Sequence, residues 1–374
     1  MAIPVNNERV VIVTGAAGFL GSAVTLELAR NAAVIAIDRR APSAALLEAT
    51  PHVNWHQVDI ADRDTLADVF QSTKRRLGRI DFVLHLAAFY HFGLDRHPEY
   101  QRTNVDGTSA VLHSAIENGA GRLIFASSIA AMLPPPSGEM LTERSPTSAY
   151  IPYGESKSAG EQMTLDASQQ LPAIVLRIGG VFTDWCELPP LDSLIRLWAG
   201  GFPLNRIVAG RGGTAIPYIH RDDLVRLVRA CVDQSAKMTP FEVLLASQHG
   251  AASHLELFDV VRRALHKSDG VKPIFVSPTT AKIGLYLRLA LGLVTRDPPY
   301  ERLWMLQFID RPWNADTTHT RNRLGWDCTQ GKGILDRLPT MVDRYLRRRD
   351  QWEQRSRART TARYVYAPES QSCQ

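Results

Sequence analysis

Two residues with acid–base chemistry, Tyr153 and Lys157, lie four positions apart in this sequence. The surrounding pattern predicts a helix from residue 153 to about 170, in which this spacing places both side chains on one face. An ammonium group beside a phenol stabilises the phenolate and lowers the pKa of the tyrosine towards neutrality. Such a tyrosine can exchange a proton with a substrate oxygen. A surface pair on an amphipathic helix is the alternative interpretation.

A third residue with matching chemistry, Ser128, ends an apolar run that precedes this helix. Its hydroxyl could hydrogen-bond the same substrate oxygen. Hydride exchange between a carbonyl carbon and a nicotinamide requires a proton donor, a charge that tunes the donor and a hydroxyl that positions the oxygen. We therefore predict Ser128, Tyr153 and Lys157 as the catalytic residues.

A glycine-rich turn near the N-terminus offers a place for a dinucleotide. The apolar run 10–14 ends at Gly15, and Gly18 and Gly21 follow as a helical pattern begins. Because glycine has no Cβ, backbone N–H groups at the start of that helix can approach a pyrophosphate closely. A tight turn that binds nothing is the alternative. The turn and the catalytic residues together favour a dinucleotide site.

Acidic residues end the next two predicted strands. Asp38 lies 23 positions beyond Gly15, where a carboxylate can accept hydrogen bonds from an adenosine ribose. Asp59 could contact the adenine amino group. A helix N-cap or turn is the alternative role of Asp38, and a strand-end turn is that of Asp59. Asp38 favours NAD, because its charge would repel a 2′-phosphate. Arg39 and Arg40 could bind such a phosphate, so NADP is the alternative cofactor.

Strand and helix patterns alternate through the first half of the chain. The predicted strands span residues 10–14, 34–38, 53–60, 81–88, 121–128 and 173–177. This alternation predicts an α/β fold with a doubly wound parallel sheet and helices on both of its faces. Ligands bind such sheets at the carboxyl ends of the strands, where the predicted site residues lie.

Charge and cysteine usage exclude several classes of function. Residues 344–374 carry eight arginines and three acidic residues, so this segment alone accounts for the formal net charge of +5. The body of the chain is therefore balanced, and nucleic-acid binding is not expected. Four scattered cysteines show neither metal-ligand spacing nor a disulfide framework, so we predict no metal site. With no signal pattern in residues 1–9, we expect a cytoplasmic protein.

Six stretches, taken together and in this order, resemble the extended short-chain dehydrogenases/reductases, also called the NAD-dependent epimerase/dehydratase family. They are residues 14–21 (TGAAGFLG), 85–88 (HLAA), 104–108 (NVDGT), 127–128 (SS), 153–157 (YGESK) and 220–223 (HRDD). The resemblance covers roughly residues 8–330. It implies a Rossmann-type domain with a smaller C-terminal substrate lobe.

The resemblance also implies which residues bind the cofactor. Lys157 would hold the nicotinamide ribose, and Phe19 with Leu20 would lie against the pyrophosphate. The full predicted set is Gly15, Gly18, Phe19, Leu20, Asp38, Arg39, Asp59, Ile60, Leu86, Ala87, Ala88, Asn104, Ser127, Tyr153 and Lys157.

The expected domain division follows from the same reading. Residues 8–178 form the dinucleotide-binding domain, and about 214–250 return to it. Residues 179–330 form mainly the substrate lobe. Residues 331–374 form a C-terminal helix, predicted from 334 to about 355, and a basic tail for which we predict disorder.

Two departures from the family pattern narrow the expected reaction. Dehydratases of this family carry an Asp-Glu pair just after the catalytic hydroxyl, whereas Ile129 and Ala130 follow Ser128 here. Many sugar-nucleotide epimerases have an asparagine near the substrate diphosphate where this chain has Gly180. The apolar segment 283–294 and Trp304 also predict a lobe that suits a less polar ligand.

We therefore predict an NAD(P)-dependent oxidoreductase that interconverts a secondary alcohol and a ketone on a moderately large, lipophilic or cyclic small molecule. The alternative is a sugar-nucleotide epimerase with tightly bound NAD, and a non-catalytic cofactor-binding protein is a third hypothesis.

Segment 283–294 is too short to span a bilayer. Its alternative roles are packing on the core, dimer contact, lipid contact and lining of the substrate site. The arginine-rich terminus could contact anionic lipids. We also expect a homodimer.

Overall fold

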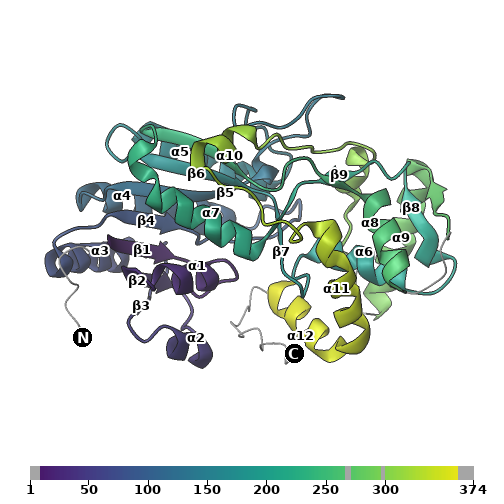
Figure 1. Ribbon diagram of the computed structural model, residues 1–374, viewed down its shortest axis with the longest axis horizontal. Helices are drawn as coiled ribbons and strands as arrows, with labels where there is room; N and C mark the ends of the chain where they lie inside the picture. The colour runs from purple at the N-terminus through teal and green to yellow at the C-terminus, as the bar shows by residue number, and fades with distance from the viewer. Residues whose placement is uncertain (1–8, 266–270, 296–299, 361–374) are drawn as a thin grey trace.

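A seven-stranded parallel sheet forms the centre of the computed structural model, which describes residues 9–265, 271–295 and 300–360 (Figure 1). The strand order is β3-β2-β1-β4-β5-β6-β11, so the order reverses between β1 and β4, where ligands bind in folds of this kind. The predicted α/β fold class is confirmed. The strands are β1 (Arg9–Thr14), β2 (Ala32–Asp38), β3 (Asn54–Gln57), β4 (Phe82–His85), β5 (Arg122–Ser128), β6 (Ala173–Ile178) and β11 (Phe241–Ala246).

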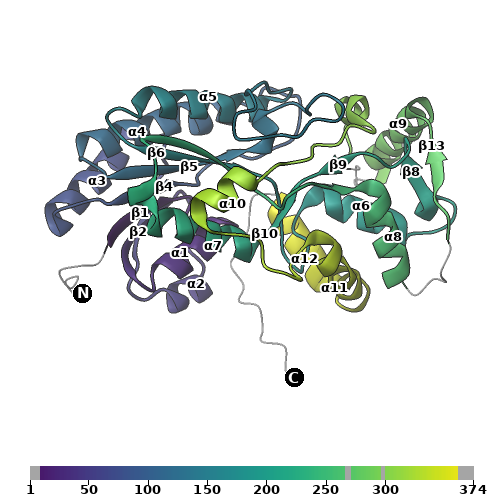
Figure 2. The ribbon, with the colours of Figure 1, turned by 45° about the horizontal axis from the view of Figure 1, so that its top comes forward.

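Helices cover both faces of this sheet (Figure 2). One layer consists of α1 (Gly21–Leu28), α7 (Arg221–Asp233) and α10 (Thr318–Leu324). The other consists of α3 (Arg63–Leu77), α4 (Gly107–Glu117) and α5 (Pro152–Ala167), and the short helix α2 (Ala44–Ala49) follows β2.

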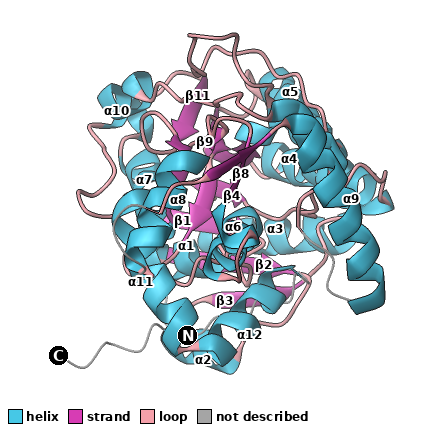
Figure 3. Cartoon of the chain, turned by 90° about the vertical axis from the view of Figure 1, so that its right-hand side faces the viewer, coloured by secondary structure: helices cyan, strands magenta, loops and turns pink. Residues whose placement is uncertain are grey.

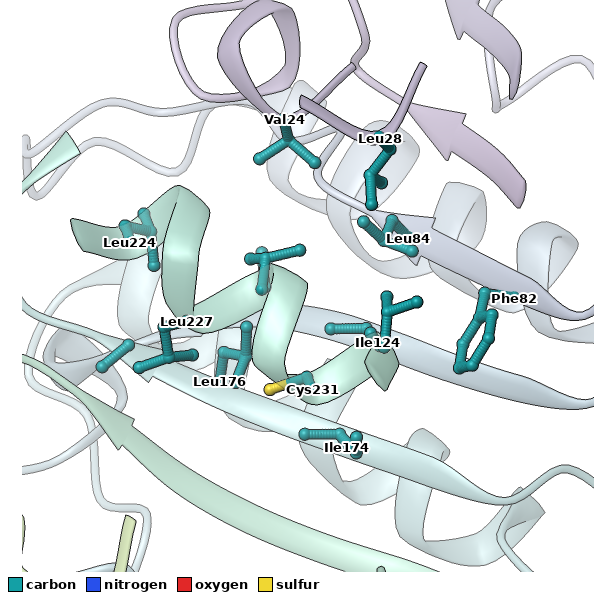
Figure 4. Packing of buried hydrophobic residues seen from close by; sticks show 14 of the residues in the cluster. Val24, Leu28, Phe82, Leu84, Ile124, Ile174, Leu176, Leu224, Leu227 and Cys231 are labelled. Carbon is teal, nitrogen blue, oxygen red and sulfur yellow. The ribbon is translucent and has the colours of Figure 1, made fainter. Parts of the chain in front are cut away.

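The alternation of side chains along each strand builds two cores. In β1, Val11 and Val13 pack in the core beneath α1 and α7, whereas Val10 and Ile12 pack in the core beneath α3 and α4. Figure 4 shows the first of these cores, with Val24 of α1 facing the sheet. A strand buried on both faces reads as the continuous apolar run seen in the sequence.

The second half of the chain builds a smaller lobe at the carboxyl ends of the strands. Its helices are α6 (Pro189–Ala199), α8 (His254–Ala264), α9 (Pro278–Thr295), α11 (Ile334–Arg347) and α12 (Arg349–Thr360). Short strand pairs join them: β7 (Gly180–Phe182) with β10 (Tyr218–His220), β8 (Ile207–Ala209) with β13 (Ile274–Val276), and β9 (Ala215–Ile216) with β12 (Ala252–Ser253). In the described residues no helix is both long and apolar enough to cross a membrane.

The C-terminal helices differ from the expected single helix and solvated tail. The chain breaks between α11 and α12, and α12 packs on the lobe with Trp352 only 1% exposed. The Trp352 indole donates to Asp192 of α6 at 2.6 Å, and Arg355 pairs with the buried Glu187 at 3.1 Å. The basic residues of α12 thus find carboxylates in the lobe, which their local sequence does not reveal. Residues 361–374 of the predicted tail lie outside the described residues.

Candidate active site

A cavity of about 510 Å³ lies between the carboxyl ends of the sheet strands and the lobe. Residues from both halves of the chain line it. Its walls include these predicted site residues: Gly15, Gly18, Phe19, Leu20, Asp38, Arg39, Asp59, Ile60, Leu86, Ala87, Ala88, Ser127, Ser128, Tyr153 and Lys157. The structure therefore brings nearly all of the predicted residues to one place.

The glycine turn leaves no room for side chains. Gly15 has a φ of +70°, and a Cβ built there would lie 2.7 Å from the Ala87 nitrogen. A Cβ on Gly21 would lie 2.0 Å from the Gly15 oxygen. Only glycines at these two positions allow the turn to pack against the end of β4. The turn can then expose its backbone N–H groups to the cavity. This cradle at the start of α1 fits the pyrophosphate of a dinucleotide.

Asp38 joins this turn to the end of β2. It is 6% exposed, and its carboxylate accepts hydrogen bonds from the backbone N–H of Ala17 at 3.0 Å and of Arg40 at 2.9 Å. Arg40 also pairs with Asp38 at 3.6 Å, and Arg39 lies 3.5 Å from Glu99. Both arginines thus lie beside carboxylates of the chain itself, and the selection of NAD by Asp38 remains a prediction.

Asp59 also lines the cavity with its carboxylate already engaged. One oxygen accepts from the backbone N–H of Ala61 at 3.0 Å, and the other pairs with Arg102 at 2.8 Å. Its contact with adenine remains a prediction.

Ser128 and Tyr153 both line the cavity, at the end of β5 and the start of α5. Ser128 ends β5, and its Oγ accepts from the backbone N–H of Ala130 at 3.1 Å. Tyr153 lies in the first turn of α5 and is 6% exposed. A Cβ on the next residue, Gly154, would lie 2.0 Å from the Ala130 oxygen. Glycine at this position therefore lets α5 come close enough to place Tyr153 beside the end of the strand.

Lys157 lies one helical turn further, inside the protein. It is 4% exposed, and its Nζ donates to the Ala126 carbonyl at 2.7 Å. The same Nζ is 6.0 Å from the centroid of the Tyr153 ring and 5.1 Å from that of Phe125. Burial lowers the pKa of Lys157 to about 8, and the charge of Glu161 opposes this shift. The ammonium can stabilise a neighbouring phenolate.

Sequence reasoning missed a buried ion pair beneath these residues. Arg177 of β6 and Glu161 of α5 are both buried and bond through two nitrogens, with the Nη2–Oε2 distance at 2.9 Å. Arg177 also donates to the Ser145 carbonyl at 2.6 Å. The Ser127 hydroxyl donates to Glu161, so Ser127 serves this network while lining the cavity. The only sequence signal was Glu161 on the helix face of Lys157.

Asn104 holds the loop after β4 rather than lining the cavity. It is 2% exposed, and its amide exchanges two hydrogen bonds with the Phe89 backbone, at 2.7 and 2.9 Å. It also donates to the Ser156 hydroxyl of α5 at 2.9 Å. Asn104 is absent from the described cavity walls, so a direct contact with the cofactor remains a prediction.

Aromatic residues form the substrate side of the cavity, and of these only Trp304 had been singled out from the sequence. The rings of Tyr90 and Phe92 lie 5.1 and 5.3 Å from that of Tyr153. Trp304 and Tyr150 meet at 5.9 Å further along the same wall. His254 also lines this wall, and burial lowers its pKa to about 4, which makes it neutral at physiological pH. This part of the cavity suits an apolar or ring-shaped group.

The fold and the site together define a Rossmann-type enzyme that binds a dinucleotide. The chain belongs to the NAD dependent epimerase/dehydratase family, whose family model matches residues 11–245. The expected family, the expected enzyme class and NAD as the cofactor are thereby confirmed.

Individual relatives are similar over part of their length. A UDP-glucose 4-epimerase of Oryza sativa is 31% identical over 179 residues, which are 44% of this chain and 46% of that protein. A UDP-glucose 4-epimerase of Streptomyces lividans is 33% identical over 156 residues, which are 41% of this chain and 45% of that protein. The chain thus spans about half the length of the curated relatives it matches.

The fold is shared with solved structures over nearly the whole chain. A Thermotoga maritima UDP-glucose 4-epimerase has a TM-score of 0.66 at 20% identity, covering 91% of this chain and 99% of that one. The Bordetella bronchiseptica enzyme WbmG in complex with NAD has a TM-score of 0.67 at 21% identity. The match covers 92% of this chain and 96% of that one.

Proposed function

We propose that this chain is an NAD-dependent epimerase. It oxidises a secondary alcohol carbon of its substrate to a ketone and then reduces that carbon from the opposite face. The placement of Ser128, Tyr153 and Lys157 on one wall of the cavity supports this proposal. Relatives named UDP-glucose 4-epimerase favour it over the net dehydrogenase that the sequence predicted.

Tyr153 is the proton-transfer group of this proposal. Its phenolate takes the proton from the substrate hydroxyl as the alcohol carbon gives up hydride, and it returns the proton when the hydride comes back. Bound NAD supplies the hydride acceptor and, once reduced, the donor. The buried ammonium of Lys157, with its Nζ 6.0 Å from the Tyr153 ring centroid, stabilises the phenolate.

Ser128 positions the substrate oxygen. Because its Oγ already accepts a hydrogen bond from the backbone N–H of Ala130, its own hydrogen can be donated to the substrate oxygen. The oxygen is then held between two hydroxyl groups, which aligns its carbon for hydride transfer.

A net dehydrogenase acting on an apolar or cyclic alcohol is the second candidate, and two observations favour it. The wall beside Tyr153 is aromatic, with Tyr90 and Phe92 packed on its ring. Helix α6 reaches this cavity with Pro189 and Pro190 in its first turn, and proline has no N–H to offer a diphosphate. Both features make the substrate side a poor match for a strongly anionic ligand.

A single set of reactions separates the two candidates. The purified protein is incubated with UDP-glucose, the appearance of UDP-galactose is followed by NMR, and reduced cofactor is followed by absorbance. The epimerase proposal expects interconversion without accumulation of NADH, and NAD released from the purified protein on denaturation. Accumulation of NADH with a cyclic alcohol such as decahydro-2-naphthol, and no conversion of the UDP-sugar, would instead establish the dehydrogenase.

A further inference from the structure

The outer face of α9 is apolar although it points to solvent. Ile283, Tyr286, Leu287 and Leu291 are 58%, 51%, 67% and 61% exposed. At 100° per residue these four side chains fall within a sector of about 140°. We call these four residues the α9 face. Helix α9 lies at the edge of the molecule in Figure 3.

The opposite side of α9 is packed as a core helix should be. Leu285 is 7% exposed and lines the active-site cavity. Arg288 reaches Glu301 at 3.5 Å, and Glu301 accepts a hydrogen bond from Ser193 of α6 at 2.7 Å. The helix is therefore anchored by its inner side, whereas the α9 face is more than half exposed.

More exposed apolar side chains lie at the same end of the lobe. Strand β13 carries Phe275, 51% exposed, and pairs with β8 in the register Phe275 to Val208. Phe202 and Leu204, 76% and 52% exposed, come just before β8. Figure 2 shows β8, β13 and α9 gathered at this end. Several large exposed apolar side chains at one end of a lobe are typical of an interaction site.

Two chain segments, which contain β8, β13 and α9, form this end of the lobe, and the only charged side chains in them are positive. Residues 200–213 and 271–295 contain no Asp or Glu and five cationic residues. Of these, Lys282 and Arg288 flank the α9 face on its two sides. An apolar stripe between basic side chains is the pattern of helices that lie in the interface of a bilayer with anionic lipids.

We propose that the α9 face docks on the surface of a bilayer that contains anionic lipid. The helix lies in the plane of the membrane, with Ile283, Leu287 and Leu291 in the region between head groups and acyl chains. Lys282 is exposed and has no ion pair among the described residues, so its ammonium is available to a lipid phosphate.

The same observations argue against a second copy of this chain as the occupant. A two-fold interface places the same patch on both subunits. Arg288 is already offset by Glu301, but two α9 faces would also bring their Lys282 ammonium groups together, and neither of the two segments supplies an acidic residue to offset these.

Sedimentation with vesicles tests the proposal on the full chain. We expect the protein to pellet with vesicles of phosphatidylcholine and phosphatidylglycerol, to pellet much less with phosphatidylcholine alone, and to be released by high salt. Replacing Leu287→Glu together with Leu291→Glu should lower the partition coefficient at least tenfold, because both substitutions remove apolar contact and add repelled charge. The matched control is Leu47→Glu with Leu165→Glu, two leucines exposed at 46% and 44% elsewhere.

A second variant keeps the test decisive if the double variant folds poorly, as judged by circular dichroism. Lys282→Glu should weaken binding to the anionic vesicles about fivefold or more and leave the melting temperature unchanged. The proposal is overturned if wild type binds neither vesicle or if both variants bind like wild type. It is also overturned if light scattering shows a dimer that the double variant dissociates, which would make the α9 face a subunit interface. None of these outcomes depends on which reaction the enzyme catalyses.

Discussion

The Nζ of Lys157 donates a hydrogen bond to the carbonyl oxygen of Ala126 at 2.7 Å, which ties helix α5 to strand β5. Ala126 lies two residues before Ser128, so this bond fixes the helix relative to the end of the strand. Lys157 therefore has two tasks that a surface lysine could not perform. It supplies positive charge near Tyr153, and it sets the distance between the elements that carry Tyr153 and Ser128.

Replacing Tyr153→Phe should remove the proton-transfer group and leave the cavity intact. We expect turnover to fall by about 10²–10⁴, the usual contribution of an acid–base group, while NAD binding changes little. Steady-state kinetics and cofactor titration measure the two quantities. Tyr150→Phe is the control, because Tyr150 lines the same cavity and contacts its neighbours through its ring. Wild-type turnover in the Tyr153 variant would exclude the proposed mechanism.

Replacing Asp38→Asn should relax the preference for NAD over NADP. The amide keeps an acceptor for the Ala17 N–H but loses the charge that repels a 2′-phosphate. We expect the ratio of kcat/KM for NADP to that for NAD to rise about tenfold or more, a change worth about 1.4 kcal/mol. Asp68→Asn on the exposed side of α3 is the control. An unchanged ratio would show that Asp38 does not select the cofactor.

Replacing Glu161→Gln should destabilise the whole domain. The substitution leaves the guanidinium of Arg177 buried without its carboxylate, which costs about 3–5 kcal/mol of the free energy of unfolding. Urea denaturation measures this loss, with Asp166→Asn as a control on the exposed side of the same helix. The double variant Glu161→Leu with Arg177→Met should lose less stability than Glu161→Gln alone. A larger loss in the double variant would mean that the ion pair itself, rather than the orphaned charge, stabilises the site.

His85 should make stability depend on pH. Its ring bonds Thr14 at 2.7 Å and Thr108 at 2.9 Å, and burial, together with the charge of Lys157, lowers its pKa to about 3. The unfolded chain binds this proton at about pH 6.5, so the folded state loses stability as the pH falls from there towards 3. We expect the stability advantage of wild type over His85→Asn to shrink by about 2 kcal/mol between pH 7.5 and pH 5.

Urea denaturation at several pH values measures that advantage. Replacing the exposed His52→Asn controls for the removal of a histidine as such. A constant difference between wild type and His85→Asn across this range would mean that the pKa of His85 is the same in the folded and the unfolded protein.

The sequence by itself predicted the features that depend on local spacing. Strand and helix periods differ, so the alternation that builds the parallel sheet is visible along the chain. Gly15 and Gly18 mark a turn whose backbone conformation few other residues adopt, and the i to i+4 spacing of Tyr153 and Lys157 places both on one helix face. These properties belong to a few neighbouring residues, and no distant contact is needed to establish them.

The tertiary structure alone decided the features that join distant segments. The aromatic wall combines Tyr90 and Phe92 with Trp304, more than two hundred positions away, and no local pattern predicts that contact. The Trp352 indole donates a hydrogen bond to Asp192, which packs the end of the predicted C-terminal helix on the lobe as the separate helix α12. The composition of segment 283–294 shows that α9 is apolar, but only the packing of the whole fold decides which side of the helix faces the core. Hydrophobic burial has no direction of its own, so the choice of partner surface is made by the whole fold.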